Sequence, residues 1–262
     1  MRSSEEKAVN LLANLGVSAG SVVDFMQFYN SDLAAYGNEV YAEVETRVVH
    51  WLNFLSDGWF NQRLDAYLRQ ADQFDLVVDL GFSVPYIYLR DDFRARVKFS
   101  GSQFLFVDSQ ENAAEFYDAL VKAYELDFEE ARDSVVIADI ENASTHDDIL
   151  RHASSKNPQS VLVVMSEVLE HLDEPGVALS LARDLLQLGQ EGDSLLYTTL
   201  PIGYQIPSHL YEFLTVESAR HWLGEFVDIV DEKVVRPEAG VKVSQHLQSC
   251  YCSFSRVKDK GV

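Results

Sequence analysis

The stretch from Val161 to Pro201, VLVVMSEVLEHLDEPGVALSLARDLLQLGQEGDSLLYTTLP, contains a strand, an acidic turn, an amphipathic helix and a second strand. Its first residues, Val161–Met165, are apolar without alternation, which is typical of a parallel strand covered on both faces. Ser166 and Glu167 follow at the point where that strand would end. Ligands bind at the carboxyl ends of such strands, so the stretch predicts the second half of a nucleotide-type α/β site.

Strands and helices alternate upstream of this stretch, from Phe74 onward. The expected strands are FDLVVDL (74–80), QFLFVD (103–108) and SVVIAD (134–139), and the expected helices cover 85–99 and 111–126. Repeated strand–helix units predict a parallel sheet.

The pattern continues after the opening stretch. Asp173, Glu174 and Pro175 are start signals for a helix over Val177–Leu188. The later elements are a helix capped by Thr215, a strand over Val227–Val235 and a last strand within 244–258. The fold class is therefore α/β, with a doubly wound, mainly parallel sheet.

The N-terminal region has a different character. Residues 5 to about 70 lack strand-like runs, and apolar residues recur there at helical spacing. We therefore divide the chain into a helical N-terminal extension or lid over 1–70 and an α/β domain over 71–262. The extension is rich in aromatic residues, which predicts either core packing or a roof over a substrate pocket.

Composition indicates the size of the domain and the cellular location that we expect. The chain has 262 residues, of which 47% are hydrophobic, enough for one large α/β domain with an extension. No apolar run approaches the roughly 20 residues that cross a bilayer, and the first residues lack a basic segment followed by a hydrophobic one. We expect a cytoplasmic protein with no membrane partner. Cys250 and Cys252 are expected to be reduced thiols in the core.

Charge narrows the choice of partners. The formal net charge is −21, and so acidic a surface repels phosphate backbones. We therefore expect no nucleic acid partner and favour a neutral or cationic small molecule. The aromatic extension also suggests pairing of two copies as a homodimer.

A family resemblance rests on the segment Glu167–Leu172, the acidic turn before Pro175 and the triplet Thr199-Leu200-Pro201. These segments resemble class I S-adenosylmethionine-dependent methyltransferases that act on small molecules, and the similarity extends over about residues 74–230. The resemblance implies a Rossmann-like sheet of seven strands with an antiparallel last strand. It also implies S-adenosyl-L-methionine as cofactor and transfer of its methyl group to an oxygen or nitrogen of a small acceptor.

The turn after the first expected strand is similar to the glycine-rich motif of this family. Asp79, Gly81 and Phe82 are the cofactor-binding candidates there, because glycine lets the backbone turn tightly beneath the methionine part. Ser83 and Pro85 stand where the family has its second and third glycines. This departure weakens the prediction of cofactor binding, and an ordinary strand-to-helix connection is the less favoured alternative for this turn.

Further cofactor contacts are implied at the next three strand ends. Asp108 would accept hydrogen bonds from both ribose hydroxyls, with Ser109 beside the adenosine. Asp139 and Ile140 would contact the adenine, although Asp139 could equally be a turn or cap residue. The last pair, Ser166 and Glu167, would lie near the methionine end.

A histidine and its acidic neighbours leave the chemistry open. Glu167, Glu170 and His171, with the later His209, resemble the metal ligands of small-RNA 2′-O-methyltransferases. The same Glu-His-Leu string occurs in metal-free small-molecule methyltransferases, and we favour that interpretation, with no metal. His209 is then the candidate catalytic base, or else a surface or capping histidine. The alternatives are a catalytically idle scaffold protein and a metal-dependent RNA 2′-O-methyltransferase.

Overall fold

The structure is a computed structural model. It describes residues 4–32, 42–56, 62, 65, 69–86, 89, 100–125, 134–189, 194–203, 209–236 and 249–258.

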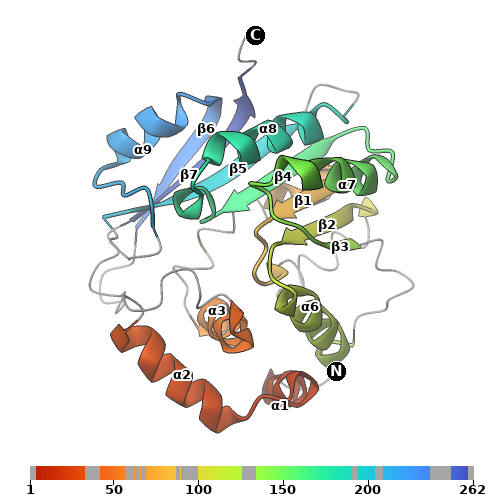
Figure 1. Cartoon of the computed structure of the whole chain (residues 1–262), viewed down its shortest axis with the longest axis vertical. Helices are drawn as coiled ribbons and strands as arrows, with labels where there is room; N and C mark the ends of the chain where they lie inside the picture. The colour runs from red at the N-terminus through yellow and green to blue at the C-terminus, as the bar shows by residue number, and fades with distance from the viewer. Residues whose placement is uncertain are drawn as a thin grey trace.

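Within these residues, seven strands form a single sheet in the order β3-β2-β1-β4-β5-β7-β6 (Figure 1). Their bounds are β1 Leu76–Leu80, β2 Gln103–Asp108, β3 Ser134–Ile137, β4 Val161–Ser166, β5 Leu195–Ile202, β6 Val227–Val235 and β7 Ser249–Val257. Strands β1 to β5 pair in parallel, and β7 is antiparallel to both β5 and β6. The predicted doubly wound, mainly parallel sheet with an antiparallel last strand is confirmed.

Helices cover both faces of this sheet. Their bounds are α1 Ser4–Leu15, α2 Ala19–Asp32, α3 Val44–Ser56, α6 Asn112–Ala123, α7 Ala143–Ser154, α8 Pro175–Leu186 and α9 Val216–Leu223, with short 3₁₀ turns at Ala71–Gln73 and Leu169–His171. Figure 1 shows α1, α2, α3 and α6 on one side of the sheet and α7, α8 and α9 on the other.

Burial on both faces explains the unbroken apolar runs of the strands. All five residues of β1 are buried. Val77 belongs to a hydrophobic cluster that includes residues of α1, α3 and α6, whereas Leu76 and Val78 belong to a second cluster with residues of α7, α8 and α9. Since successive side chains of a strand point to opposite faces, a strand between two helical layers has apolar residues on both faces, and in β1 only Asp79 departs from this pattern.

Most predicted elements are found within a few residues of their expected bounds. The strands β2 and β6 have the predicted limits, and α8 begins at Pro175. Thr215 caps α9, where its hydroxyl accepts a hydrogen bond from the Ser218 backbone in a reciprocal capping box. The predicted helix over 85–99 lies mostly outside the described residues.

The helix α7 was not among the predicted elements. Its sequence, ASTHDDILRHAS, is polar, and only Ile149 and Ala153 are buried. Asn142 caps its first turn by accepting a hydrogen bond from Ser144 N. So short an apolar stripe gives little helical periodicity to detect.

The N-terminal helices share the core of the sheet. Leu11 of α1 and both Val48 and Trp51 of α3 are buried in the same cluster as Val77 and Phe106 of the sheet. The described part of residues 1–70 is helical, as expected, while the proposed boundary at residue 70 stays a prediction.

None of the described helices is, by itself, long and apolar enough to span a membrane. Residues 6–15 and 19–25 pass such a test only when joined, and they are bent by 85° relative to each other. Leu11 and Val22, one from each segment, are buried in the core.

The two cysteines are reduced and buried, as predicted. Cys250 and Cys252 lie on β7 with their sulfur atoms 3.9 Å apart. They share one face of the strand because they are two residues apart.

Candidate functional site

The carboxyl ends of β1 to β5 meet at one edge of the sheet because these strands are parallel. The predicted site residues lie near the ends of these strands or in the segments that follow them: Asp79, Gly81, Phe82, Asp108, Ser109, Asp139, Ile140, Ser166, Glu167 and His209. The topology therefore brings to one side of the molecule residues that are far apart in the sequence.

The turn after β1 has a left-handed backbone at two positions. Gly81 has φ +74° and Ser83 has φ +42°, so the serine keeps a conformation that normally favours glycine. A Cβ atom on Gly81 would lie 2.7 Å from a methyl carbon of Val168, in the loop after β4. Gly81 is thus required by its backbone angle and by the close approach of Val168. The third glycine position, Pro85, lies in the buried continuation of the turn.

Asp79 is a buried carboxyl group with unusual acidity. It is 6% exposed, and burial together with the nearby charge of Asp108 raises its pKa to about 8. The side chain of Phe82 is 2% exposed and packs against Phe106 with ring centroids 5.2 Å apart. Its ring is therefore part of the core, and the prediction of a cofactor contact at Phe82 stays untested.

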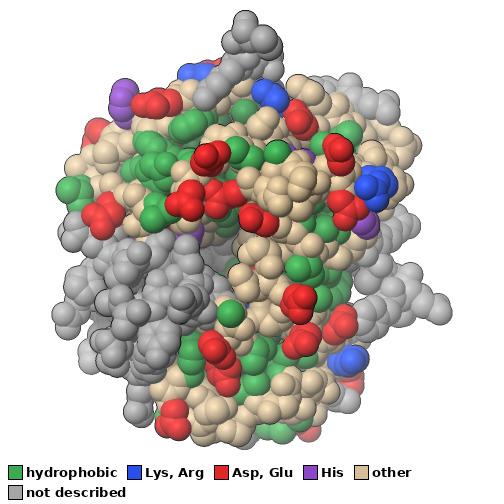
Figure 2. Space-filling model, viewed as in Figure 1, with side chains coloured by type: hydrophobic (Ala, Val, Ile, Leu, Met, Phe, Trp, Pro, Cys, Tyr) green, Lys and Arg blue, Asp and Glu red, His purple; other side chains and the backbone are tan. Residues whose placement is uncertain are grey.

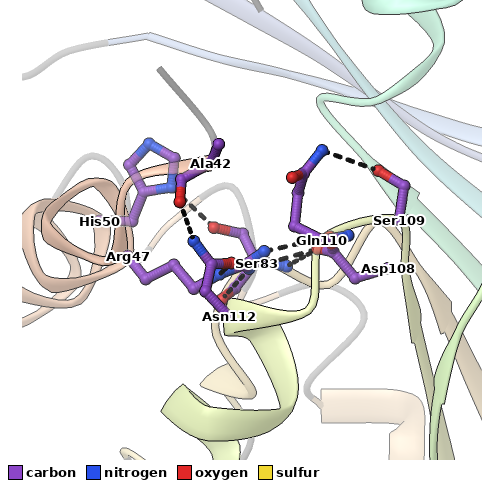
Figure 3. A network of polar contacts seen from close by, with 8 residues as sticks. All are labelled: Ala42, Arg47, His50, Ser83, Asp108, Ser109, Gln110 and Asn112. Atoms are coloured by element: carbon purple, nitrogen blue, oxygen red, sulfur yellow. Dashed lines mark hydrogen bonds and ion pairs between the residues drawn. The ribbon is translucent and has the colours of Figure 1, made fainter. Parts of the chain in front are cut away.

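Asp108, the predicted ribose ligand, lies at the centre of a polar network (Figure 3). Its Oδ1 accepts hydrogen bonds from Arg47 Nη2 (3.0 Å) and from Gln110 N (2.9 Å). Its Oδ2 accepts hydrogen bonds from Arg47 Nη1 (3.2 Å) and from Ser83 N (3.3 Å). Each carboxylate oxygen of Asp108 therefore accepts two hydrogen bonds.

Arg47 was missed by the analysis of the sequence. It belongs to α3, is 3% exposed, and also donates from Nε to Asn112 Oδ1 (2.7 Å) and from Nη1 to Ser83 O (2.7 Å). One signal exists in the sequence: Arg47 stands three residues after Val44 and four before Trp51, so in a helix it shares the face of these apolar residues. A charge at a buried helix position needs a partner elsewhere in the fold.

The adenine candidates lie after β3. Asp139 is exposed and its Oδ1 accepts a hydrogen bond from Glu141 N (2.9 Å), so its carboxylate stabilises a turn. Ile140 is 7% exposed and packs in the core. Ser109, after β2, is exposed. The turn role that was left open for Asp139 is thus observed.

The end of β4 is tied to β5. The hydroxyls of Ser166 and Thr199 lie 2.9 Å apart, and Glu167 N donates to Thr199 O (3.2 Å). Glu167 has φ +55°, a second non-glycine residue in the left-handed region at this edge. Its carboxylate accepts a hydrogen bond from Cys250 Sγ (3.6 Å).

His209 lies in a compact group with Glu170 and His171. One ligand atom from each of the three lies within 4.8 Å of the others, and the two imidazole rings are edge to face with centroids 4.7 Å apart. Glu170 is completely buried. Its carbonyl oxygen accepts hydrogen bonds from Leu210 N (2.7 Å) and Tyr211 N, which fix the loop that carries His209.

The group of Glu170, His171 and His209 is relevant to whether this site binds a metal ion. Carboxylate and imidazole groups are ordinary ligands of zinc and similar cations, and three protein ligands leave room for a reacting group. Of the four residues considered from the sequence, Glu167 is not in the group. The expectation of a metal-free site is not tested by these contacts.

Comparisons with known proteins bear on the fold. No family model matches the sequence, and no curated protein matches it. A candidate methyltransferase from Thermobifida fusca YX has a structure similar to 98% of this chain and 95% of its own, with 15% identity and a TM-score of 0.52. The chain therefore has the class I methyltransferase fold, as the resemblance implied.

Two further solved structures are similar over most of this chain. A SAM-dependent methyltransferase from Anabaena variabilis matches 92% of this chain and 96% of its own at 11% identity, with a TM-score of 0.45. Magnesium protoporphyrin IX methyltransferase from Synechocystis PCC 6803, solved with bound SAM, matches 91% and 98% at 14% identity, with a TM-score of 0.44.

Replacing Gly81 with alanine is expected to destabilise the protein by about 1–3 kcal/mol, because the new Cβ meets Val168 at a positive φ. Urea unfolding followed by circular dichroism measures the change. Gly176→Ala is the matched control, since its Cβ would lie in helix α8 at 3.8 Å from Phe226. Equal stability of the two variants would contradict the proposed close approach.

Asp79 is expected to make stability fall as the pH rises. Its folded pKa of about 8 exceeds the ordinary value of 3.8, so between these values the folded state binds more protons than the unfolded state. This contribution lowers stability from about pH 4 to pH 8, by at most about 1.4 kcal/mol per pH unit, and then levels off. In Asp79→Asn the slope should disappear, whereas the exposed Asp228→Asn should keep it. Parallel stability curves for the wild type and Asp79→Asn would show that the carboxyl is ionised normally.

Proposed function

We propose that this protein is an S-adenosyl-L-methionine-dependent methyltransferase that transfers a methyl group to an oxygen, or a nitrogen, of a small molecule. One observation carries the proposal. In a fold shared with methyltransferases, the left-handed turn at Gly81–Ser83, the carboxylate of Asp108 and the polar ends of β3 and β4 line one edge of the sheet in the expected order.

The cofactor would lie along this edge and would supply an activated methyl group on a sulfonium ion. Asp108 would accept the ribose hydroxyls, while Asp139 and Ile140 would contact the adenine. Gly81 and Ser83 would let the backbone approach the methionine part, beside Ser166 and Glu167.

Asp79 fits a cationic ligand. Its pKa of about 8 leaves the buried carboxyl mostly protonated at neutral pH. A sulfonium or ammonium group close to it would favour the ionised form, so binding of the cofactor would release a proton. An uncharged ligand at the same place would leave the proton in position.

His209 would act as the base when the acceptor is a hydroxyl. The cofactor would supply the methyl group to the acceptor oxygen, and the imidazole of His209 would take the proton that this hydroxyl loses. The loop bonds from Leu210 N and Tyr211 N to Glu170 O hold this histidine at the edge. Alignment and exclusion of water would supply much of the rate.

The charge of the protein supports a small acceptor. The formal net charge is −21, and Figure 2 shows acidic side chains distributed over one face with few basic ones among them. Such a surface repels a polyanion but leaves neutral and cationic molecules unhindered.

Calorimetric titration tests the proposal directly. EDTA-treated protein should bind S-adenosylmethionine and its demethylated product with micromolar affinity. In Asp108→Asn the affinity should fall at least about tenfold, because the amide presents one acceptor oxygen in place of a carboxylate. The exposed Asp228→Asn is the control. A folded protein that binds neither compound would favour the idle scaffold instead.

A second candidate, a transferase that needs a divalent cation, is favoured by the grouping of Glu170, His171 and His209. A bound cation would polarise the acceptor oxygen, and the three residues would hold it. In that case EDTA-treated protein should bind one Zn²⁺ per chain, and both Glu170→Gln and His209→Gln should abolish binding. The exposed His221→Gln on α9 should not affect it. Absence of stoichiometric binding to the wild type would remove this candidate.

A further inference from the structure

The carboxylate of Asp108 has no capacity left for a ligand in this structure. An ionised carboxylate offers about four lone-pair positions, and Arg47, Ser83 N and Gln110 N fill them with two hydrogen bonds on each oxygen. Asp108 is buried at 9% exposure and Arg47 at 3%. Another donor can reach Asp108 only if one of the present donors leaves.

Two of the four donors belong to a side chain and two to the backbone. Ser83 N and Gln110 N are held by the turns after β1 and β2, whereas both remaining hydrogen bonds come from the Arg47 guanidinium. Removal of this one side chain would open one position on Oδ1 and one on Oδ2. A ribose has two adjacent hydroxyls, which match these two positions in number and would occupy them as a bidentate pair.

We propose that Arg47 is a built-in competitor of the cofactor ribose, so that the guanidinium must leave Asp108 before the cofactor can bind. The proposal rests on the proposed function, because it takes Asp108 as the ribose ligand. It makes Arg47 the residue that sets the affinity and links the N-terminal helix α3 to occupancy of the site.

The network around Arg47 supports a competing state rather than an incidental contact. The guanidinium also binds Ser83 O and Asn112 Oδ1, both at 2.7 Å, and the next turn of α3 places His50 Nδ1 2.8 Å from Ser83 Oγ (Figure 3). Serine thus supplies a hydroxyl that a glycine at this position could not. The departure from the glycine-rich pattern therefore adds a contact to the same helix that carries Arg47.

A competitor of this kind raises the apparent Kd of the ligand. The apparent Kd equals the intrinsic Kd divided by the fraction of molecules in which the guanidinium has left Asp108. For an open state populated at about 10% or less, removal of the competitor should tighten binding about tenfold or more. The gain should depend on the ribose hydroxyls, because they are the groups that take the two vacated positions.

Titration calorimetry on the full chain with three probes tests the proposal: S-adenosylhomocysteine, adenosine and 2′,3′-dideoxyadenosine. In Arg47→Met, which has a similar length and no donors, the first two should bind about tenfold or more tightly than in the wild type. 2′,3′-Dideoxyadenosine lacks the 2′ and 3′ hydroxyls that would replace the guanidinium on Asp108, so its affinity should not change. Arg220→Met removes an arginine that pairs with Glu232 near the far edge of the sheet, and it should bind all three probes like the wild type.

Arg47→Lys covers the case in which Arg47→Met fails to fold, which a thermal melt would reveal. Lysine keeps the charge but not the bidentate geometry, so a smaller gain is expected for the two ribose probes. Unchanged or weaker binding of S-adenosylhomocysteine to the folded variants would overturn the competitor proposal while leaving the proposed function intact. Failure of the wild type and all variants to bind any probe would instead overturn the proposed function.

Discussion

The parallel pairing of β1 with β2 on one side and with β4 on the other positions the whole candidate site. Because the three strands run in the same direction, the loops that follow them emerge together. Gly81 N donates to Val107 O (2.7 Å) at the end of β2, and the Gly81 Cα faces Val168 after β4. The turn after β1 is thus confined between its two neighbours, and at Gly81 a side chain has no space. The same confinement removes Asp79 from water and changes its acidity.

Asp79 and Asp108 are buried carboxyl groups at the ends of neighbouring strands, and two negative charges there would repel each other. The fold reduces this repulsion in two ways. Asp79 tends to keep its proton, whereas Asp108 is paired with a buried guanidinium. The guanidinium comes from the N-terminal helices and not from the α/β domain. Helix α3 therefore contributes a charge to the polar network at this edge as well as apolar surface to the core.

The sheet could be predicted from sequence because its signals are local. The mainly apolar sequences of β1, β2 and β4 and the cap at Thr215 each act within a few residues. The contacts of the site are not local: Arg47 and Asp108 are 61 residues apart and meet only through the packing of α3. No short-range pattern encodes such a pair. The serine in the glycine-rich turn indicated a weakened motif, yet its backbone angle depends on neighbours that the sequence does not reveal.

The two sulfur atoms on β7 have a consequence for following the protein in solution. They are the only cysteines of the chain, both are buried, and their strand lies between β5 and β6 inside the sheet. A thiol reagent can reach them only when this part of the sheet opens. The rate at which they are alkylated under native conditions therefore reports the opening free energy of the antiparallel half of the sheet, without any engineered label.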